Sequence, residues 1–210
     1  MACSSCPTGK VSWGEFIPYV SLYAQGVPDE VAADAIRRAT IEFANKVDAI
    51  QQTICIDAQE CVDHYCIEFD DCYTVKRVCS VCVYDRRYEA RREWEHYPPD
   101  CSYYYEHPCD LYISPVANCD QKDGIEVEVT LIPGQDSCFV DRYIYAEYAE
   151  QIGYGALSRL LLIPDTNWYD PRSAGYYENR FRESIGSAKQ EVSRGNNSEP
   201  MYARPRRILI

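Results

Sequence analysis

Cysteine is the residue type most able to do chemistry in this chain, because twelve of the 210 residues are cysteine. Cys3 with Cys6, and Cys79 with Cys82, have the two-residue spacing with which pairs of thiolates bind zinc tetrahedrally. The second pair, however, lies in what reads as a continuous strand, where an odd offset points side chains to opposite faces. We therefore predict no metal site and no cofactor. A zinc-binding cytoplasmic interaction module stays open as an alternative.

Disulfide bonds explain the cysteines more economically than a metal ion does. Most of them fall in or beside a region with few large aliphatic residues, where each covalent link could contribute about 2–4 kcal/mol. Some could instead be buried free thiols, since cysteine packs as a small hydrophobic residue. One sequence does not give the connectivity, nor whether bonds lie within or between subunits. The candidate disulfide cysteines are Cys3, Cys6, Cys55, Cys61, Cys66, Cys72, Cys79, Cys82, Cys101, Cys109, Cys119 and Cys138.

Catalytic chemistry has little support in the residue pattern. His64, His96 and His107 lie in turn-rich segments without a recognisable motif, and no glycine-rich phosphate loop is present. Glu147 and Glu150 resemble a carboxylate pair, but two acids three residues apart on a helix usually mark a solvated face. The sequence therefore predicts no catalytic residues and a role other than that of an enzyme.

The charge distribution predicts an acidic body with a basic end. Thirty-three acidic against 21 basic residues give a net charge of -12, which argues against sequence-independent binding to nucleic acid. No run approaches the roughly 20 apolar residues that span a bilayer, and the first residues lack the features of a secretory signal. We therefore expect neither membrane insertion nor secretion. Assembly inside a reducing cytoplasm, with oxidation of the thiols after release, would reconcile this expectation with the many cysteines.

The C-terminal tail has a composition of its own. Its arginines could pair with carboxylates while its apolar end fills a groove, as expected of an arm that orders on a partner. The predicted partner-binding residues are Arg204, Arg206, Arg207, Ile208, Leu209 and Ile210. Tyrosine, with 19 residues, also suits subunit interfaces, and Tyr103–Tyr105 form the most obvious cluster.

Periodicity divides the chain into helical ends and a β-rich middle. A capping box at Ser12 and Glu15 predicts a short helix to about Tyr23, and Pro28 opens an amphipathic helix to about Val47. Further helices are expected from about 141 to 163 and from Pro171 onward, whereas 49–131 carry short, turn-separated strands. The expected fold is α+β: a helical bundle of an N-terminal hairpin and two C-terminal helices, with a cysteine-rich antiparallel β insertion and an extended tail. The expected regions are 1–48 (arm and hairpin), 49–140 (insertion), 141–192 (C-terminal helices) and 193–210 (tail).

Two stretches resemble the head-to-tail adaptor (connector, or head-completion) proteins of tailed bacteriophages. The first runs from Trp13 to Val20 and continues through Val27–Glu30, Ala35–Ala39 and Glu42–Phe43. The second runs from Tyr145 to Leu160 and continues through Pro164, Trp168, Asp170–Pro171, Ala174, Tyr177 and Phe181. Together the matches cover about half of the chain, at its two ends.

The resemblance implies a structural virion protein at the head-to-tail junction, the neck. Such a subunit would form a homo-oligomeric ring, with twelve copies as the expected number, that docks under the portal protein and extends the DNA channel. The tail residues would bind the portal, another face would bind a neck or tail protein, and genomic DNA would pass along acidic walls without specific binding. A neck stopper or a tail-completion subunit is the alternative within this class.

Overall fold

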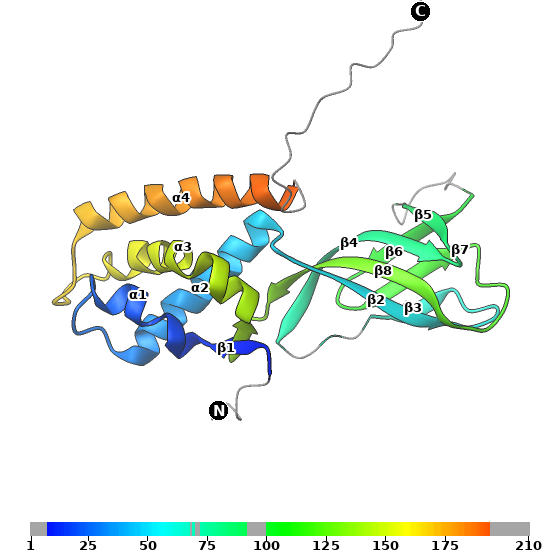
Figure 1. Cartoon of the computed structure of the whole chain (residues 1–210), viewed down its shortest axis with the longest axis horizontal. Coiled ribbons are helices and arrows are strands. Elements are labelled where there is room, and N and C mark those ends of the chain that lie inside the picture. Colours follow the sequence, from blue (N-terminus) through cyan, green and yellow to red (C-terminus); the bar gives the residue numbers. More distant parts are fainter. Residues whose placement is uncertain (1–7, 68, 70–71, 92–99, 194–210) are drawn as a thin grey trace, which may run out of the picture.

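The protein has a helical half and a sheet half that lie side by side along its long axis (Figure 1). This computed structural model describes residues 8–67, 69, 72–91 and 100–193. The helical half contains a 3-10 turn, η1 (Trp13–Phe16), and the helices α1 (Pro18–Ser21), α2 (Asp29–Val47), α3 (Arg142–Leu160) and α4 (Pro171–Ser193). The expected helices beginning near 28, 141 and 171 are thereby confirmed.

Helix α2 forms where the sequence combines a favourable start with one apolar face. Pro28 precedes it, Asp29 and Glu30 complement the positive end of the helix dipole, and Ile36 and Phe43 are fully buried. The helix ends at Asp48, whose φ of 60° places it in the left-handed region. The Asp48 carboxylate accepts hydrogen bonds from Lys76 and Arg77 of the sheet half, at 2.7 and 2.9 Å. Its end is therefore tied to the sheet.

Two glycines of α3 allow its neighbours to approach closely. A Cβ atom at Gly153 would lie 3.1 Å from the Cβ of Tyr19 in α1, and one at Gly155 would lie 2.8 Å from the ring of Phe181 in α4. Contacting carbon atoms normally keep about 3.5–4.0 Å between them. The missing side chains at these two positions therefore set how tightly α1 and α4 pack on α3.

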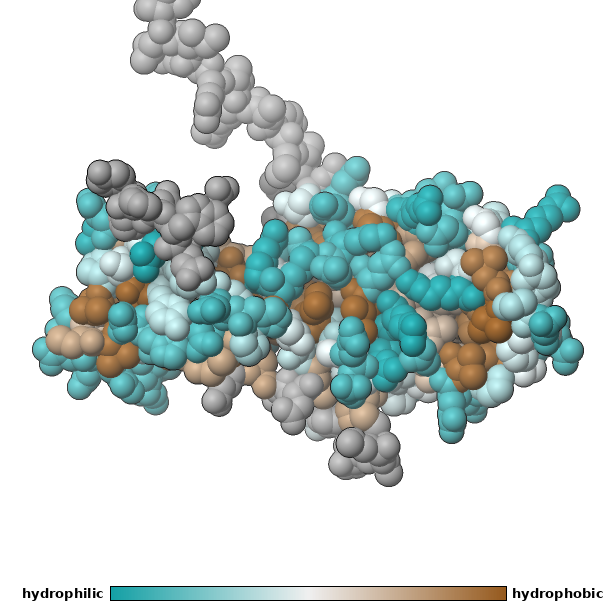
Figure 2. Space-filling view, turned by 180° about the vertical axis from the view of Figure 1, so that it is seen from behind, coloured by the Kyte–Doolittle hydropathy of each residue, from teal (hydrophilic) through white to brown (hydrophobic). Residues whose placement is uncertain are grey.

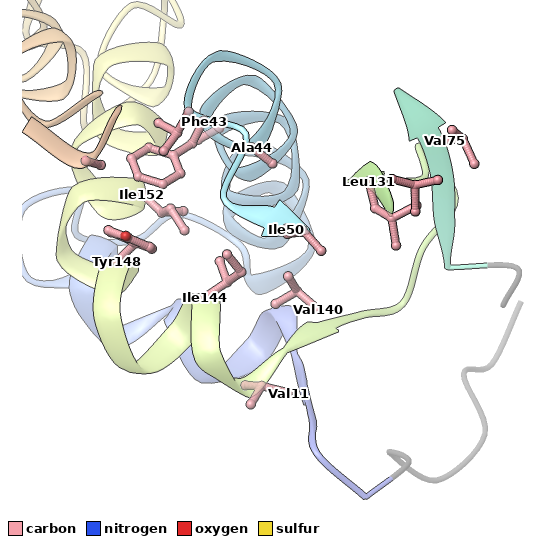
Figure 3. Packing of buried hydrophobic residues seen from close by; sticks show 14 of the residues in the cluster. Val11, Phe43, Ala44, Ile50, Val75, Leu131, Val140, Ile144, Tyr148 and Ile152 are labelled. Atoms are coloured by element: carbon pink, nitrogen blue, oxygen red, sulfur yellow. The ribbon is translucent and has the colours of Figure 1, made fainter. Parts of the chain in front are cut away.

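Aromatic residues from both ends of the sequence meet in the helical core. The ring of Phe43 in α2 lies 4.8 Å from Tyr148 in α3 and 6.3 Å from Phe181 in α4, measured between centroids. Buried residues of both halves belong to one cluster, and in the close view Ile50 lies between Phe43 of α2 and Leu131 of the sheet (Figure 3). Both halves therefore share one hydrophobic core.

The sheet half consists of seven strands in the order β2-β8-β4-β5-β6-β7-β3. The long strand β8 alternates buried Ile125, Val127 and Val129 with the more exposed Glu126 and Glu128, as its sequence predicts. The alternation ends at Thr130, which is fully buried beside Leu131. A separate pair, β1 with β9, joins the N-terminus to the start of α3. The strands are β1 (Lys10–Ser12), β2 (Ile50–Ala58), β3 (His64–Cys66), β4 (Tyr73–Val83), β5 (Arg86–Ala90), β6 (Ser102–Glu106), β7 (Asp110–Ser114), β8 (Gln121–Pro133) and β9 (Phe139–Asp141).

The expected fold was wrong in its account of the β region. A helical bundle with a small antiparallel insertion does not describe a structure in which seven strands form one large sheet beside the helices. The sheet is also mixed, because β5 and β6 pair in parallel, with Glu89 opposite Ser102. Parallel pairing needs a connection longer than a hairpin turn, and residues 91–101 supply it. The α+β class itself agrees with the structure.

The predicted capping box at Ser12 was wrong as well. Ser12 pairs with Phe139 as the last residue of β1, and its side chain makes no capping hydrogen bond. The following residues form η1 and the short α1 instead of one helix reaching Tyr23. Pairing with β9, which lies more than 120 residues away along the chain, therefore overrides the local capping pattern.

Candidate interaction surface and thiol sites

An exposed apolar surface lies at the end of the helical half that is farthest from the sheet. Leu22 is 66% exposed, Tyr23 55% and Tyr176 59%. We call this the helical-end surface, and apolar residues are visible at that end in Figure 2, at the right. Its members come from the end of α1, the α3–α4 connection and the first turns of α4: Leu22, Tyr23, Leu162, Ile163, Tyr169 and Tyr176.

Ring contacts hold part of this surface in place. Buried Tyr177 contacts Tyr23 at 5.5 Å, Tyr176 at 5.3 Å and, in a stacked arrangement, Tyr154 at 5.9 Å. Burial, followed by the neighbouring Tyr23 and Tyr176, raises the pKa of Tyr177, so its hydroxyl stays protonated at neutral pH. Exposed tyrosines on a rigid support provide contact area together with a hydrogen-bonding group. The surface is therefore suited to contact another protein.

Sequence reasoning missed the helical-end surface and emphasised a different tyrosine cluster. Tyr103 is buried in β6, and its hydroxyl donates to the carbonyl of Val78 at 3.3 Å. Tyr104 stacks on Tyr112 of β7, at 5.8 Å between ring centroids. These tyrosines therefore contact neighbouring strands of their own sheet. Tyr176 was the better sequence indication of an exposed contact surface, since it lies outside the apolar face of an amphipathic helix.

The predicted partner-binding tail lies outside the described residues. These residues, Arg204, Arg206, Arg207, Ile208, Leu209 and Ile210, follow the last described residue, Ser193. Near that point Val192 lines an open groove together with Ala49, Ile50, Asp141 and Tyr143. The described part of α4 thus ends where the helical and sheet halves meet.

The predicted disulfide cysteines fall into several groups in the structure. Cys138 is disulfide-bonded, while Cys3 and Cys6 lie outside the described residues. Among the described cysteines, one pair lies close together: the Sγ atoms of Cys66 and Cys109 are 2.7 Å apart. Free thiols, from exposed to buried, are present at Cys55, Cys61, Cys72, Cys79, Cys82, Cys101 and Cys119.

Cys79 and Cys82 lie in β4, which is irregular at Cys79. The pairing of β4 with β8 shifts register between Val78 and Ser80, so Cys79 lies at a bulge that the sequence did not reveal. Its Sγ lies 3.1 Å from the Oγ1 of Thr130. Within residues 8–67, 69, 72–91 and 100–193, no group of three or more histidine, cysteine, aspartate or glutamate side chains is arranged to hold a metal ion.

The residues considered for catalysis are scattered. His64 is paired with Asp110 at 2.6 Å and stacks on Tyr112, whereas His107 is exposed and His96 lies outside the described residues. Both Glu147 and Glu150 are exposed on α3, which agrees with the predicted solvated helix face. The described ones therefore lie on three separate elements: β3, the turn between β6 and β7, and α3.

Comparison with known proteins adds no relative. Neither a protein-family model nor a curated protein sequence matches this chain. No helix in the described part of the chain is long and apolar enough to cross a membrane. The resemblance to phage adaptors therefore stays a prediction that depends on the residues quoted for it.

Proposed function

We propose that this chain is a structural virion subunit, a head-to-tail adaptor that assembles as a ring below a phage portal. One observation supports this most directly: the two stretches that resemble adaptors lie at opposite ends of the sequence, yet they pack as one helical body. Phe43 from the first stretch contacts Tyr148 and Phe181 from the second. The stretches therefore behave as parts of one structural unit.

The helical body would form the wall of the ring, and the helical-end surface would contact a neighbouring copy. Exposed, contiguous apolar residues on a soluble protein commonly mark a protein interface. Leu22 and Tyr176 are both more than half exposed in the single chain, so burying them on a neighbour would favour assembly. The sheet half would project from this body and offer a surface to a neck or tail protein.

The acidic charge and the basic tail would serve different contacts. A net charge of -12 suits a channel through which DNA passes without specific binding, because acidic walls repel phosphates. The tail arginines, with Ile208–Ile210, would reach the portal and pair there with carboxylates and an apolar groove. The subunit would act in the virion neck after assembly in the host cytoplasm.

Electron microscopy of the purified protein mixed with a phage portal tests the proposal. We expect closed rings, with twelve subunits, stacked coaxially on the portal. Truncation after Ser198 should leave the thermal unfolding of the chain unchanged and abolish portal binding. A protein that stays monomeric with the portal at micromolar concentrations, and is absent from purified virions, would contradict the proposal.

A matched pair of surface variants tests the ring contact separately. Tyr176→Asp places a charge on the helical-end surface, whereas Gln190→Asp places the same charge on an exposed position near the other end of α4. We expect only Tyr176→Asp to prevent ring formation, because a buried unpaired carboxylate is costly. Equal assembly of both variants would exclude this surface from the ring contact.

A further inference from the structure

The close approach of Cys66 and Cys109 occurs at the edge of the seven-stranded sheet. Strand β3 has three residues and pairs with β7 alone, with Cys66 opposite Asp110. The amide of Ile67 donates to the carbonyl of Cys109 at 2.8 Å, which aligns the two backbones beyond the end of the strand. Backbone pairing therefore holds the two Sγ atoms together, 2.7 Å apart.

Two polar side chains lie beside this pair. His64, two residues before Cys66 on the same face of β3, is paired through Nε2 with Asp110 at 2.6 Å. Tyr105 also lies close, since burial and then the nearby Cys109 and Asp110 raise its pKa to about 12. This tyrosine is therefore protonated at neutral pH.

Solvent reaches the pair as well. Cys66 is exposed and Cys109 is half-buried, whereas Cys101 of the same region is buried. A small oxidant could therefore attack the pair without unfolding of the sheet, and thiol reactivity depends on such access.

We propose that Cys66 and Cys109 form a site of reversible thiol oxidation, at which a glutathione-type disulfide converts the two thiols into one intramolecular disulfide. One thiolate attacks the oxidant, forming a mixed disulfide and releasing one glutathione thiol. The second thiolate then attacks the protein sulfur of the mixed disulfide, forming the Cys66–Cys109 bond and releasing the second glutathione. Both thiol protons end on the two glutathione molecules, and two electrons pass from the protein to the oxidant.

The bond would link the edge strand β3 covalently to β7. The bond would form in an oxidising medium and be absent in a reducing cytoplasm. The edge of the sheet would therefore become more stable after release from a cell. This inference does not depend on the proposed function. A failure of the adaptor proposal leaves the thiol chemistry unchanged, and the reverse also holds.

Peptide mapping of the full chain tests this site. The protein is incubated with oxidised glutathione, remaining thiols are alkylated, and the sample is digested with chymotrypsin without reduction. Cleavage after aromatic residues separates Cys66–Phe69 from Glu106–Tyr112, and each of these peptides contains a single cysteine. We expect the two peptides to appear joined, with a mass two hydrogens below their sum, and to separate after reduction.

Serine variants supply the controls. Cys66→Ser and Cys109→Ser should each abolish the joined peptide and lower the melting temperature of the oxidised protein, with little change in the reduced protein. Cys55→Ser, at an exposed thiol on β2, should leave both properties unchanged. Full alkylation of Cys66 and Cys109 after oxidation, or a bond from either to another cysteine, would overturn the proposal.

Discussion

The contact between Gly155 and Phe181 makes a quantitative prediction about how the helices pack. A Cβ atom at position 155 would lie 2.8 Å from the Cε2 and Cζ atoms of the Phe181 ring. That ring is 1% exposed and also contacts Phe43, so it has little room to move. Gly155→Ala should therefore strain the packing of α4 on α3.

The size of the effect follows from two opposing contributions. Forcing one extra methyl group into a packed core costs about 1–3 kcal/mol, while replacing glycine by alanine inside a helix contributes about 1 kcal/mol in the other direction. Gly186→Ala in α4 is the matched control, because a Cβ atom there meets nothing within 4 Å. The two variants should then differ by about 1–3 kcal/mol. At roughly 2–4 °C per kcal/mol for a chain of this size, their melting temperatures should differ by roughly 2–12 °C.

Thermal and urea unfolding, followed by circular dichroism in reducing buffer, measure this difference. A Phe181→Ala background removes the ring, so in that background Gly155→Ala should stabilise the protein as Gly186→Ala does. The reasoning is refuted if Gly155→Ala melts at or above the temperature of Gly186→Ala. It is equally refuted if the deficit persists without the ring.

Three further contacts give predictions that unfolding experiments can check. Burial raises the pKa of Glu42, but its hydrogen bond with Lys46 and the charge of Arg159 outweigh that effect and lower the pKa overall. The stability advantage over Glu42→Gln should therefore be present at neutral pH and shrink as the pH falls from about 5 through the lowered pKa, as urea titrations would show. Asp170 accepts hydrogen bonds from the amides of Arg172 and Ser173 at 3.1 and 3.2 Å, so Asp170→Ala should lower the melting temperature more than Asp170→Asn, which keeps a capping oxygen. The indole of Trp13 donates to the carbonyl of Ser137 at 2.7 Å in a buried site; Trp13→Phe should cost about 1–3 kcal/mol in urea unfolding, and an unchanged midpoint would contradict this.

The sequence identified cysteine as the reactive residue type without showing which thiols meet. Cys66 and Cys109 are separated by more than 40 residues, and their approach depends on the pairing of β3 with β7. The bulge at Cys79 likewise depends on pairing with β8. The sequence argument that Cys79 and Cys82 point to opposite faces assumed a regular strand, and only the pairing shows that the strand is irregular there. The helical-end surface was missed because residues from α1 and α4 share it only after folding.

The sequence by itself determined the elements that depend on local periodicity and end signals. Helices α2, α3 and α4 begin within a residue or so of their predicted starts, and β8 alternates from Ile125 to Val129 as its residues predict, because burial of one face follows from a repeat of 3.6 or 2 residues. Tertiary structure decided the pairing of β1 with β9, the parallel β5 and β6, and the contacts that Gly153 and Gly155 allow. These features join residues that are distant along the chain. Their energies depend on which surfaces meet, and no local pattern records that.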